Sequence, residues 1–299
     1  MEKSKLSIAA VVVTYNRKEL LKESIECLLK QELTVPSVLV IDNHSTDGTR
    51  EFLHNYTIQG QIEYFDTGSN LGGAGGFAYG IRKAAELGYG YIWVMDDDCM
   101  PTETALEELL KADRELDHPY GFLSSKVLWK DGNLCEMNLQ RDTITHTIEC
   151  LEDKIKPVVM ASFVSLFLPT NIVREIGLPI KEFFIWTDDW EYTRRISRQY
   201  PCYAVPKSVV IHKSKSNIGA NIATESADRL DRFDYLYRND VYLYRREGIK
   251  GVCYEAIRLT AHCVRVFLKS PDHKRERIKK IISGTKKGFG FKPEIEYIE

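Results

Sequence analysis

The chain has 299 residues, which is enough for one large or two ordinary domains with a complete hydrophobic core. It is 43% hydrophobic and 28% charged, and it contains no low-complexity tract or internal repeat, so it is expected to fold as a globular protein. The formal net charge of −2 gives no reason to predict a nucleic-acid partner. No apolar run approaches the roughly 18 residues that a membrane span requires.

The first apolar run, IAAVVV at 8–13, follows two lysines and so has the outline of a short signal peptide. Its β-branched residues, its brevity and the lack of a small-residue cleavage site favour a first buried strand instead. The seven cysteines are scattered and none forms a C-x-x-C pair. They suggest neither a disulfide framework nor a zinc site, and we expect reduced thiols and a cytoplasmic location.

Strands and helices alternate in the first part of the chain. Short apolar runs predict buried strands at 8–13, 37–42, 61–66 and 91–95. Apolar residues at helical spacing predict helices at 18–31, 45–53, 77–88 and 101–112. This order predicts an α/β fold with a doubly wound, mostly parallel sheet, in which ligands bind at the carboxyl ends of the strands.

The second part of the chain is mixed and then helical. Further strands are predicted at 121–129, 158–168 and 208–212, and a helix is predicted to begin at 187. Residues 130–160 match no pattern that assigns them a role, and an acceptor-side loop or hairpin is one interpretation. Between residues 245 and 292, fourteen Lys or Arg face four acids. We therefore predict a domain boundary near 220, with a basic, aromatic, helical region at 221–299.

Asp96, Asp97 and Asp98 follow an apolar strand directly. Carboxylates this close raise one another's pKa unless a cation lies among them. On an extended chain, Asp96 and Asp98 would project to the same side, which suits Mg²⁺ or Mn²⁺. The alternative is an acidic turn that caps the following helix.

A second acidic pair opens the helix predicted at 187. With Asp188 as N-cap and Glu191 as the third helical residue, a reciprocal capping arrangement would form, and Asp189 would have no structural role. The aromatic neighbours would raise the pKa of a partly buried carboxylate, as a general base requires, so we predict that Asp189 is catalytic. His212 ends a later apolar strand and is either a structural histidine or a third metal ligand.

The stretch NLGGAGGFAYG at 70–80 is rich in glycine. Gly73, Gly75 and Ala78 fit the spacing G-x-G-x-x-A, but a dinucleotide-binding fingerprint belongs on the first strand-to-helix turn and this stretch follows the third strand. A helix is predicted to begin at Phe77, directly after the loop that holds the first glycines, and its N-terminus favours an anion. A merely flexible loop is therefore disfavoured.

Together these motifs resemble the inverting glycosyltransferases of family 2. The matching segments are VVVTYNR (11–17), VLVIDNHSTDGT (38–49), YIWVMDDDCMP (91–101), DDWEY (188–192) and IHKSKSN (211–217). NLGGAGGFAYG is similar to the bacterial galactofuranosyl- and rhamnosyltransferases within that family. The resemblance implies a GT-A fold over residues 1–220 and makes the glycine stretch a wall of the donor site.

The resemblance also implies roles for individual residues. Asp189 matches the catalytic base, and Asp96, Asp98 and His212 match the ligands of Mn²⁺ or Mg²⁺. The residues that it places around the nucleotide-sugar donor are Thr14, Tyr15, Arg17, Asp42, Asn43, Asn70, Gly73, Ala74, Gly75, Asp96, Asp97, Trp186 and Asp188. Trp190 follows the acidic pair where the galactofuranosyl enzymes have a small residue, which leaves the donor and the acceptor open.

The implied reaction is sugar transfer with inversion, from UDP-galactofuranose or alternatively dTDP-rhamnose, to a glycan or a polyprenyl-diphosphate-linked acceptor of a bacterial surface polysaccharide. The region 221–299 is then either a solvated helical cap or a contact with the anionic inner face of the plasma membrane. The oligomeric state is open, a homo-oligomer included.

Two other functions fit the sequence less well. A sugar nucleotidyltransferase should carry glycines on its first strand-to-helix turn, which here reads TYNRKEL. A non-catalytic nucleotide-sugar-binding scaffold would be expected to lack the carboxylates or His212, all of which are present.

Overall fold

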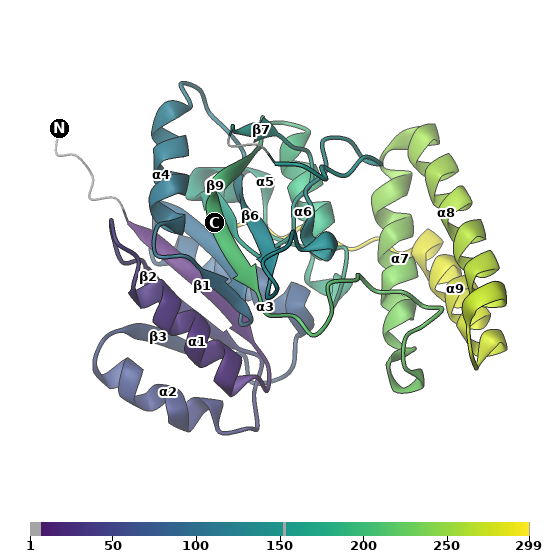
Figure 1. The fold of residues 1–299 in the computed structure, drawn as a ribbon, viewed down its shortest axis with the longest axis horizontal. Helices are drawn as coiled ribbons and strands as arrows, with labels where there is room; N and C mark the ends of the chain where they lie inside the picture. Colours follow the sequence, from purple (N-terminus) through teal and green to yellow (C-terminus); the bar gives the residue numbers. More distant parts are fainter. Residues whose placement is uncertain (1–6, 152–153, 299) are drawn as a thin grey trace.

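The protein is built on one mixed β-sheet with helices on both faces and a group of three helices beside it (Figure 1). The computed structural model describes residues 7–151 and 154–298, and within them the sheet has nine strands. The strands are β1 (Ile8–Thr14), β2 (Ser37–Asp42), β3 (Ile62–Asp66), β4 (Tyr91–Asp96), β5 (Cys99–Pro101), β6 (Leu123–Trp129), β7 (Lys156–Pro157), β8 (Leu166–Pro169) and β9 (Tyr203–His212).

The sheet has the order β3-β2-β1-β4-β8-β6-β9-β5, and β7 pairs with β9. The first four strands are parallel, as their alternation with helices predicted. β8 is antiparallel to both β4 and β6, and β6 is parallel to β9. β6 and β9 therefore point the same way as β1, and the carboxyl ends of β1, β2, β4 and β9 meet at one edge.

Six helices cover the two faces of the sheet. They are α1 (Lys18–Leu29), α2 (Thr49–Ile58), α3 (Gly72–Glu86), α4 (Ala105–Glu115), α5 (Thr170–Ile176) and α6 (Asp188–Ser197). Side chains of α1, α2 and α4, such as Leu21 and Leu109, join one buried cluster with the sheet. Those of α3, α5 and α6, such as Ile81 and Tyr192, join the other. The predicted α/β fold is confirmed.

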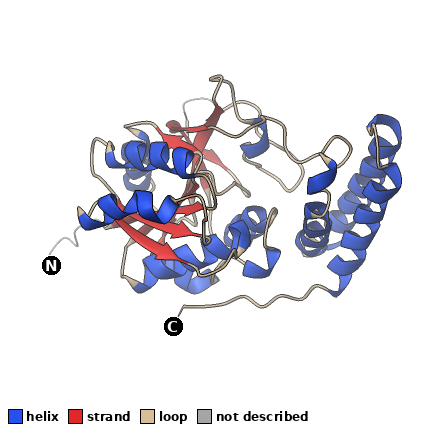
Figure 2. Ribbon diagram, turned by 90° about the horizontal axis from the view of Figure 1, so that it is seen from below, coloured by secondary structure: helices blue, strands red, loops and turns tan. Residues whose placement is uncertain are grey.

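The C-terminal helices α7 (Arg232–Arg245), α8 (Gly248–Lys269) and α9 (Lys274–Gly290) pack on one another at one end of the molecule (Figures 1 and 2). Their shared core includes Phe233, Tyr237, Val266 and Ile281. Buried Arg277 donates to the backbone carbonyls of Ile222 and Glu225, at 2.6 and 2.8 Å, and so ties the segment before α7 to α9. The predicted boundary at 220 stays a prediction.

After α9 the chain runs back to the sheet, as Figure 2 shows. The backbone N–H of Leu178 donates to the carbonyl of Glu296 at 2.8 Å. The Glu296 carboxylate pairs with Arg82 of α3 at 2.6 Å and with Lys181. The chain therefore passes between the sheet domain and the three helices twice.

Two predicted elements differ in the structure. The strand predicted at 158–168 is reduced to β8, because Ser165 has a φ of 147° and interrupts the extended backbone before it. The helix predicted from Pro101 begins at Ala105, since Pro101 lies in β5 and pairs with β9. No helix in the described ranges combines the length and the hydropathy needed to cross a bilayer.

Candidate active site

Polar side chains gather where the parallel strands end. Thr14 ends β1, Asp42 ends β2, Asp96 ends β4 and His212 ends β9. Thr14, Asp42 and His212 are buried, and Asp96 is half-buried. Because these strands share one direction, the structure brings residues from four distant motifs to a single edge.

Asp97 and Asp98 form a turn between β4 and β5. The extended chain on which the prediction for Asp96 and Asp98 depended is therefore not found there. Thr14 Oγ1 donates to Asp97 Oδ2 at 2.7 Å. One nitrogen of Arg17, Nη1, lies 3.2 Å from Asp97 Oδ1 and 2.7 Å from Asp98 Oδ2. Burial raises the pKa of Asp97 to about 6, and burial with the Asp98 charge raises that of Asp96 to about 7. Three carboxyl groups thus lie close together, and a cation bound among them would reduce their mutual repulsion.

His212 faces Asp98 across this turn. Its Nε2 lies 3.1 Å from Asp98 Oδ1, and its Nδ1 lies 2.7 Å from Asn138 Oδ1. Since an amide oxygen only accepts, Nδ1 donates to it and Asn138 fixes the orientation of the ring. Burial opposes the charge of His212, but the hydrogen bonds to Asp98 and Cys135 and the charges of Asp98 and Asp96 together outweigh it and raise the pKa to about 10. Asp98 is likewise buried, yet its bond to His212 lowers its pKa.

The donor set fits a divalent cation. Ligand atoms of Asp98, Cys99 and His212 lie within 4.8 Å of one another, and all three residues are buried. Carboxylate oxygen suits Mn²⁺ or Mg²⁺, and the imidazole nitrogen favours Mn²⁺, the softer of the two. Burial raises the pKa of the Cys99 thiol well above its usual value, which keeps it protonated and makes it the poorer ligand. Asp96, the other predicted ligand, is outside this cluster but interacts electrostatically with His212.

Asp188 and Asp189 open α6. Asp188 is buried, whereas Asp189 keeps part of its surface accessible. Burial raises the pKa of Asp188 to about 6. Burial, then the charge of Asp188 and that of Asp96, raise the pKa of Asp189 well above its usual value. Asp189 is therefore the more accessible acid of the pair, and it lies within electrostatic range of the acidic turn.

The predicted reciprocal cap at this helix is wrong. Thr187 occupies the N-cap position and Asp188 is already helical, so Glu191 does not reach back but pairs with Arg195 at 2.9 Å. Phe184, Trp186 and Thr187 all have left-handed backbone, with φ between 63° and 68°. Such backbone costs on the order of 1–3 kcal/mol per residue and persists only where the surroundings enforce it. Trp186 packs its ring against Phe233 of α7, with 5.2 Å between centroids.

The glycine stretch is helical rather than a loop, because α3 begins at Gly72. A Cβ on Gly76 would lie 2.5 Å from Val13 Cγ1, and one on Gly80 would lie 2.4 Å from Val11 Cγ1. A Cβ on Gly72, which has a φ of +72°, would lie 2.1 Å from the carbonyl oxygen of Phe184. The glycines therefore let α3 lie close to β1 and to the turn before α6.

Other residues that were predicted to bind the nucleotide-sugar lie around the start of α3. Asn43 Nδ2 donates to the Gly72 carbonyl at 2.9 Å, and Asn70 Oδ1 accepts from the Gly72 N–H at 2.9 Å. Asp42 is buried and accepts from Ser45 N at 2.9 Å and from Tyr64 at 2.8 Å. Its oxygens are thus already engaged within the protein. Tyr15 is exposed, Gly73 is half-buried, and Ala74 and Gly75 are buried.

Two residues of the unassigned segment 130–160 reach the site. Asn138 supports His212, and the Arg141 guanidinium lies 3.5 Å from the centroid of the Trp190 ring. Arg141 also donates to the Tyr244 hydroxyl at 3.1 Å. No sequence pattern indicated either contact, because the partners are 74 residues apart in one case and 103 in the other.

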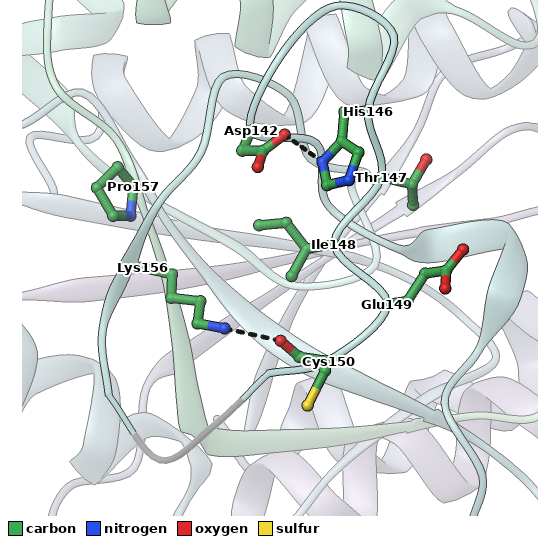
Figure 3. A pocket seen from close by; sticks show the side chains of 8 residues that line it. All are labelled: Asp142, His146, Thr147, Ile148, Glu149, Cys150, Lys156 and Pro157. Carbon is green, nitrogen blue, oxygen red and sulfur yellow. Dashed lines mark hydrogen bonds and ion pairs between the residues drawn. The ribbon is translucent and has the colours of Figure 1, made fainter.

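A pocket of about 690 Å³ lies on the same segment (Figure 3). Asp142 and His146 contact each other at its rim, and Lys156 donates to the Cys150 carbonyl at 2.8 Å. None of the predicted site residues lines it.

Comparison with known proteins agrees with this geometry. The family described as Glycosyl transferase family 2 matches residues 9–123. The chain is 26% identical over 265 residues to galactofuranosyltransferase GlfT1 of Mycolicibacterium smegmatis, covering 81% of this chain and 84% of that one.

Solved structures share the fold. S. aureus TarS 1-349 in complex with UDP has a TM-score of 0.55 at 14% identity, over 95% of this chain and 72% of that chain. The mannosyltransferase PcManGT from Pyrobaculum calidifontis, in complex with GDP-Man and Mn²⁺, has a TM-score of 0.56 at 13% identity, over 94% and 74%.

Proposed function

We propose that this protein, a glycosyltransferase that carries a glycosyl transferase family 2 domain at residues 9–123, moves a sugar with inversion from a nucleotide-sugar to a glycan or polyprenyl-diphosphate-linked acceptor. UDP-galactofuranose is the favoured donor, because the relative that spans most of the chain is a galactofuranosyltransferase.

The observation that carries the proposal is the position of Asp189. Asp189 is a partly accessible carboxylate with a raised pKa. It interacts electrostatically with Asp96, which lies at the edge where the parallel strands end. In a single in-line displacement, an acceptor hydroxyl oxygen bonds to the anomeric carbon as the bond to the nucleoside diphosphate breaks. Asp189 would accept the hydroxyl proton.

The remaining side chains would bind and orient the donor. Asp97, held by Thr14 and Arg17, would lie near the ribose or the donor sugar. Asp98 and His212 would hold a divalent cation, with Asp96 as a further ligand. Such a cation neutralises charge on a leaving diphosphate and orients it.

Nucleotide binding tests the donor. In calorimetric titrations, we expect UDP to bind tightly only with Mn²⁺ or Mg²⁺ present, and dTDP to bind more weakly under the same conditions. A preference for dTDP would indicate that the donor is dTDP-rhamnose, with the same catalytic residues. Binding of neither nucleotide with any metal would contradict the proposal.

A membrane contact is the second part of the proposal. The outer side of α8 is apolar along its length: Ile249, Ile257, Phe267 and Leu268 are each at least 70% exposed. α8, α9 and the segment that joins them carry the exposed cations Lys250, Arg265, Lys269, Lys274, Arg275, Lys279 and Lys286, against the exposed acids Asp272 and Glu276. Exposed apolar side chains with an excess of cations suit an anionic lipid surface, whereas two copies facing each other here would bring like charges together. Such a contact would place the active site near a lipid-linked acceptor.

We expect the protein to sediment with phosphatidylcholine vesicles that contain phosphatidylglycerol, at low salt, and less with phosphatidylcholine alone. Ile257→Glu and Phe267→Glu should each reduce the bound fraction several-fold, because a carboxylate replaces buried apolar area and is repelled by the lipid charge. Ile58→Glu is the matched control, since Ile58 is 70% exposed on α2. Equal binding by all three variants would contradict this part.

A further inference from the structure

In the turn at 183–187, which leads into the acidic pair, one buried side chain of α7 contacts three backbone carbonyls. Asn239 is fully buried, and its Nδ2 lies 3.0 Å from the carbonyl of Phe183, 3.1 Å from that of Ile185 and 2.9 Å from that of Trp186. Its Oδ1 accepts from Arg238 at 2.9 Å, which fixes the amide. These carbonyls flank the left-handed residues, so the amide enforces a backbone that the residues themselves disfavour.

The next residue on α7 holds the last position of the turn. Asp240 Oδ1 accepts from Thr187 Oγ1 at 2.7 Å, and both residues are buried. The other oxygen of Asp240 pairs with Arg258 of α8, which in turn pairs with Glu255 at 2.7 Å. Thr187 directly precedes Asp188, so this chain of contacts runs from α8 to the first residue of α6.

The same turn contacts the glycine helix on its other side. The carbonyl of Phe184 accepts from the Ala74 N–H at 3.2 Å and lies where a side chain on Gly72 would have to be. The turn is thus packed between the start of α3 and α7, and a shift of the turn would move Asp188 and Asp189 relative to the acidic turn.

We propose that Asn239 and Asp240 are positioning residues for sugar transfer: they hold the 183–187 turn so that Asp189 faces the reacting hydroxyl. This inference rests on the proposed function, in which Asp189 is the base. It makes the C-terminal helices part of the catalytic machinery. Asn239 contacts the backbone of Trp186, a predicted donor-site residue, but neither Asn239 nor Asp240 bonds to Thr14, Arg17 or Asp97 at the acidic turn. Misplacing a catalytic group by about 1 Å can lower a rate roughly a hundredfold, so the effect should be large.

The test compares Asn239→Ala and Thr187→Val with Thr187→Ser. Val has the shape of Thr without the hydroxyl, whereas Ser keeps the hydroxyl that Asp240 accepts. We expect Asn239→Ala and Thr187→Val to lower kcat roughly ten- to hundredfold, with UDP affinity unchanged within about threefold. Thr187→Ser should keep kcat near the wild-type value. Tyr237→Phe is the control: Tyr237 lies on α7 like Asn239, but its hydroxyl bonds to His262 of α8, at 3.0 Å, away from the turn.

A double-mutant cycle separates positioning from general loosening. In an Asp189→Asn background, Asn239→Ala should lower the residual rate no further, because it acts through Asp189. Wild-type kcat in both Asn239→Ala and Thr187→Val would overturn the inference, as would a parallel loss of UDP affinity or an undiminished effect in the Asp189→Asn background. Should Asn239→Ala fail to fold, Thr187→Val carries the test. Full turnover by Asp189→Asn alone would instead overturn the base assignment, so the two failures are distinguishable.

Discussion

Asp189→Asn is expected to lower kcat about 10²- to 10⁴-fold while UDP still binds. The amide keeps the shape of the side chain and can still accept from the Trp190 N–H, now 2.7 Å from Asp189 Oδ1, but it cannot take the proton of the acceptor hydroxyl. The measurement is single-turnover transfer from a radiolabelled nucleotide-sugar, with calorimetric UDP binding on the same preparation. Turnover near wild type would remove Asp189 from the mechanism.

The pH dependence gives an independent check on the same residue. A base must be ionised, so its raised pKa moves the acid limb of the kcat profile well above pH 4, and activity is lost as the pH falls through it. Asp188→Asn removes the adjacent charge, which should lower the pKa of Asp189 and move that limb to lower pH. An unchanged limb in Asp188→Asn would show that another group titrates.

Removing the divalent cation should be nearly as damaging. Treatment with EDTA is expected to lower turnover on the order of a hundred- to a thousandfold, and readdition of Mn²⁺ or Mg²⁺ should restore it. His212→Ala and Asp98→Asn should lose most of this metal response, since each removes one donor of the buried pair. The measurement is turnover against metal concentration, with UDP binding followed in parallel.

His118→Ala is the matched control, because His118 is exposed and lies away from the acidic turn, where it contacts Tyr203 and the neighbouring carbonyl of Pro119. It should keep the full metal response. A metal response that survives in His212→Ala would show that the cation is held elsewhere.

Much of the site could be predicted because strand direction determines where strand ends lie. Thr14, Asp42 and Asp96 follow apolar runs that alternate with helices, so their meeting at one edge follows from the parallel sheet. His212 was predictable for the same reason. These residues needed only local patterns and the rule that ligands bind at carboxyl ends.

The side chains that hold these residues in place could not be predicted in this way. Asn138 is separated from His212 by 74 residues, and Asn239 reaches the carbonyl of Trp186 across 53. The left-handed backbone at Trp186 opposes the preference of a bulky side chain, so only tertiary contacts explain it. The glycines before Phe77 were expected in a loop, because local propensity disfavours glycine in a helix and the close approach to β1 is visible only in three dimensions.

The returning C-terminal tail changes how the molecule must assemble. Because the segment around Glu296 packs beside Leu178 and Arg82, these contacts cannot form until that segment has left the ribosome. They therefore form later in synthesis than the contacts among the first strands, unlike those of an N-terminal domain that closes on its own. Because the chain connects α7–α9 to the sheet at both ends, the three helices have a narrower range of rotation than a group attached at one end would have.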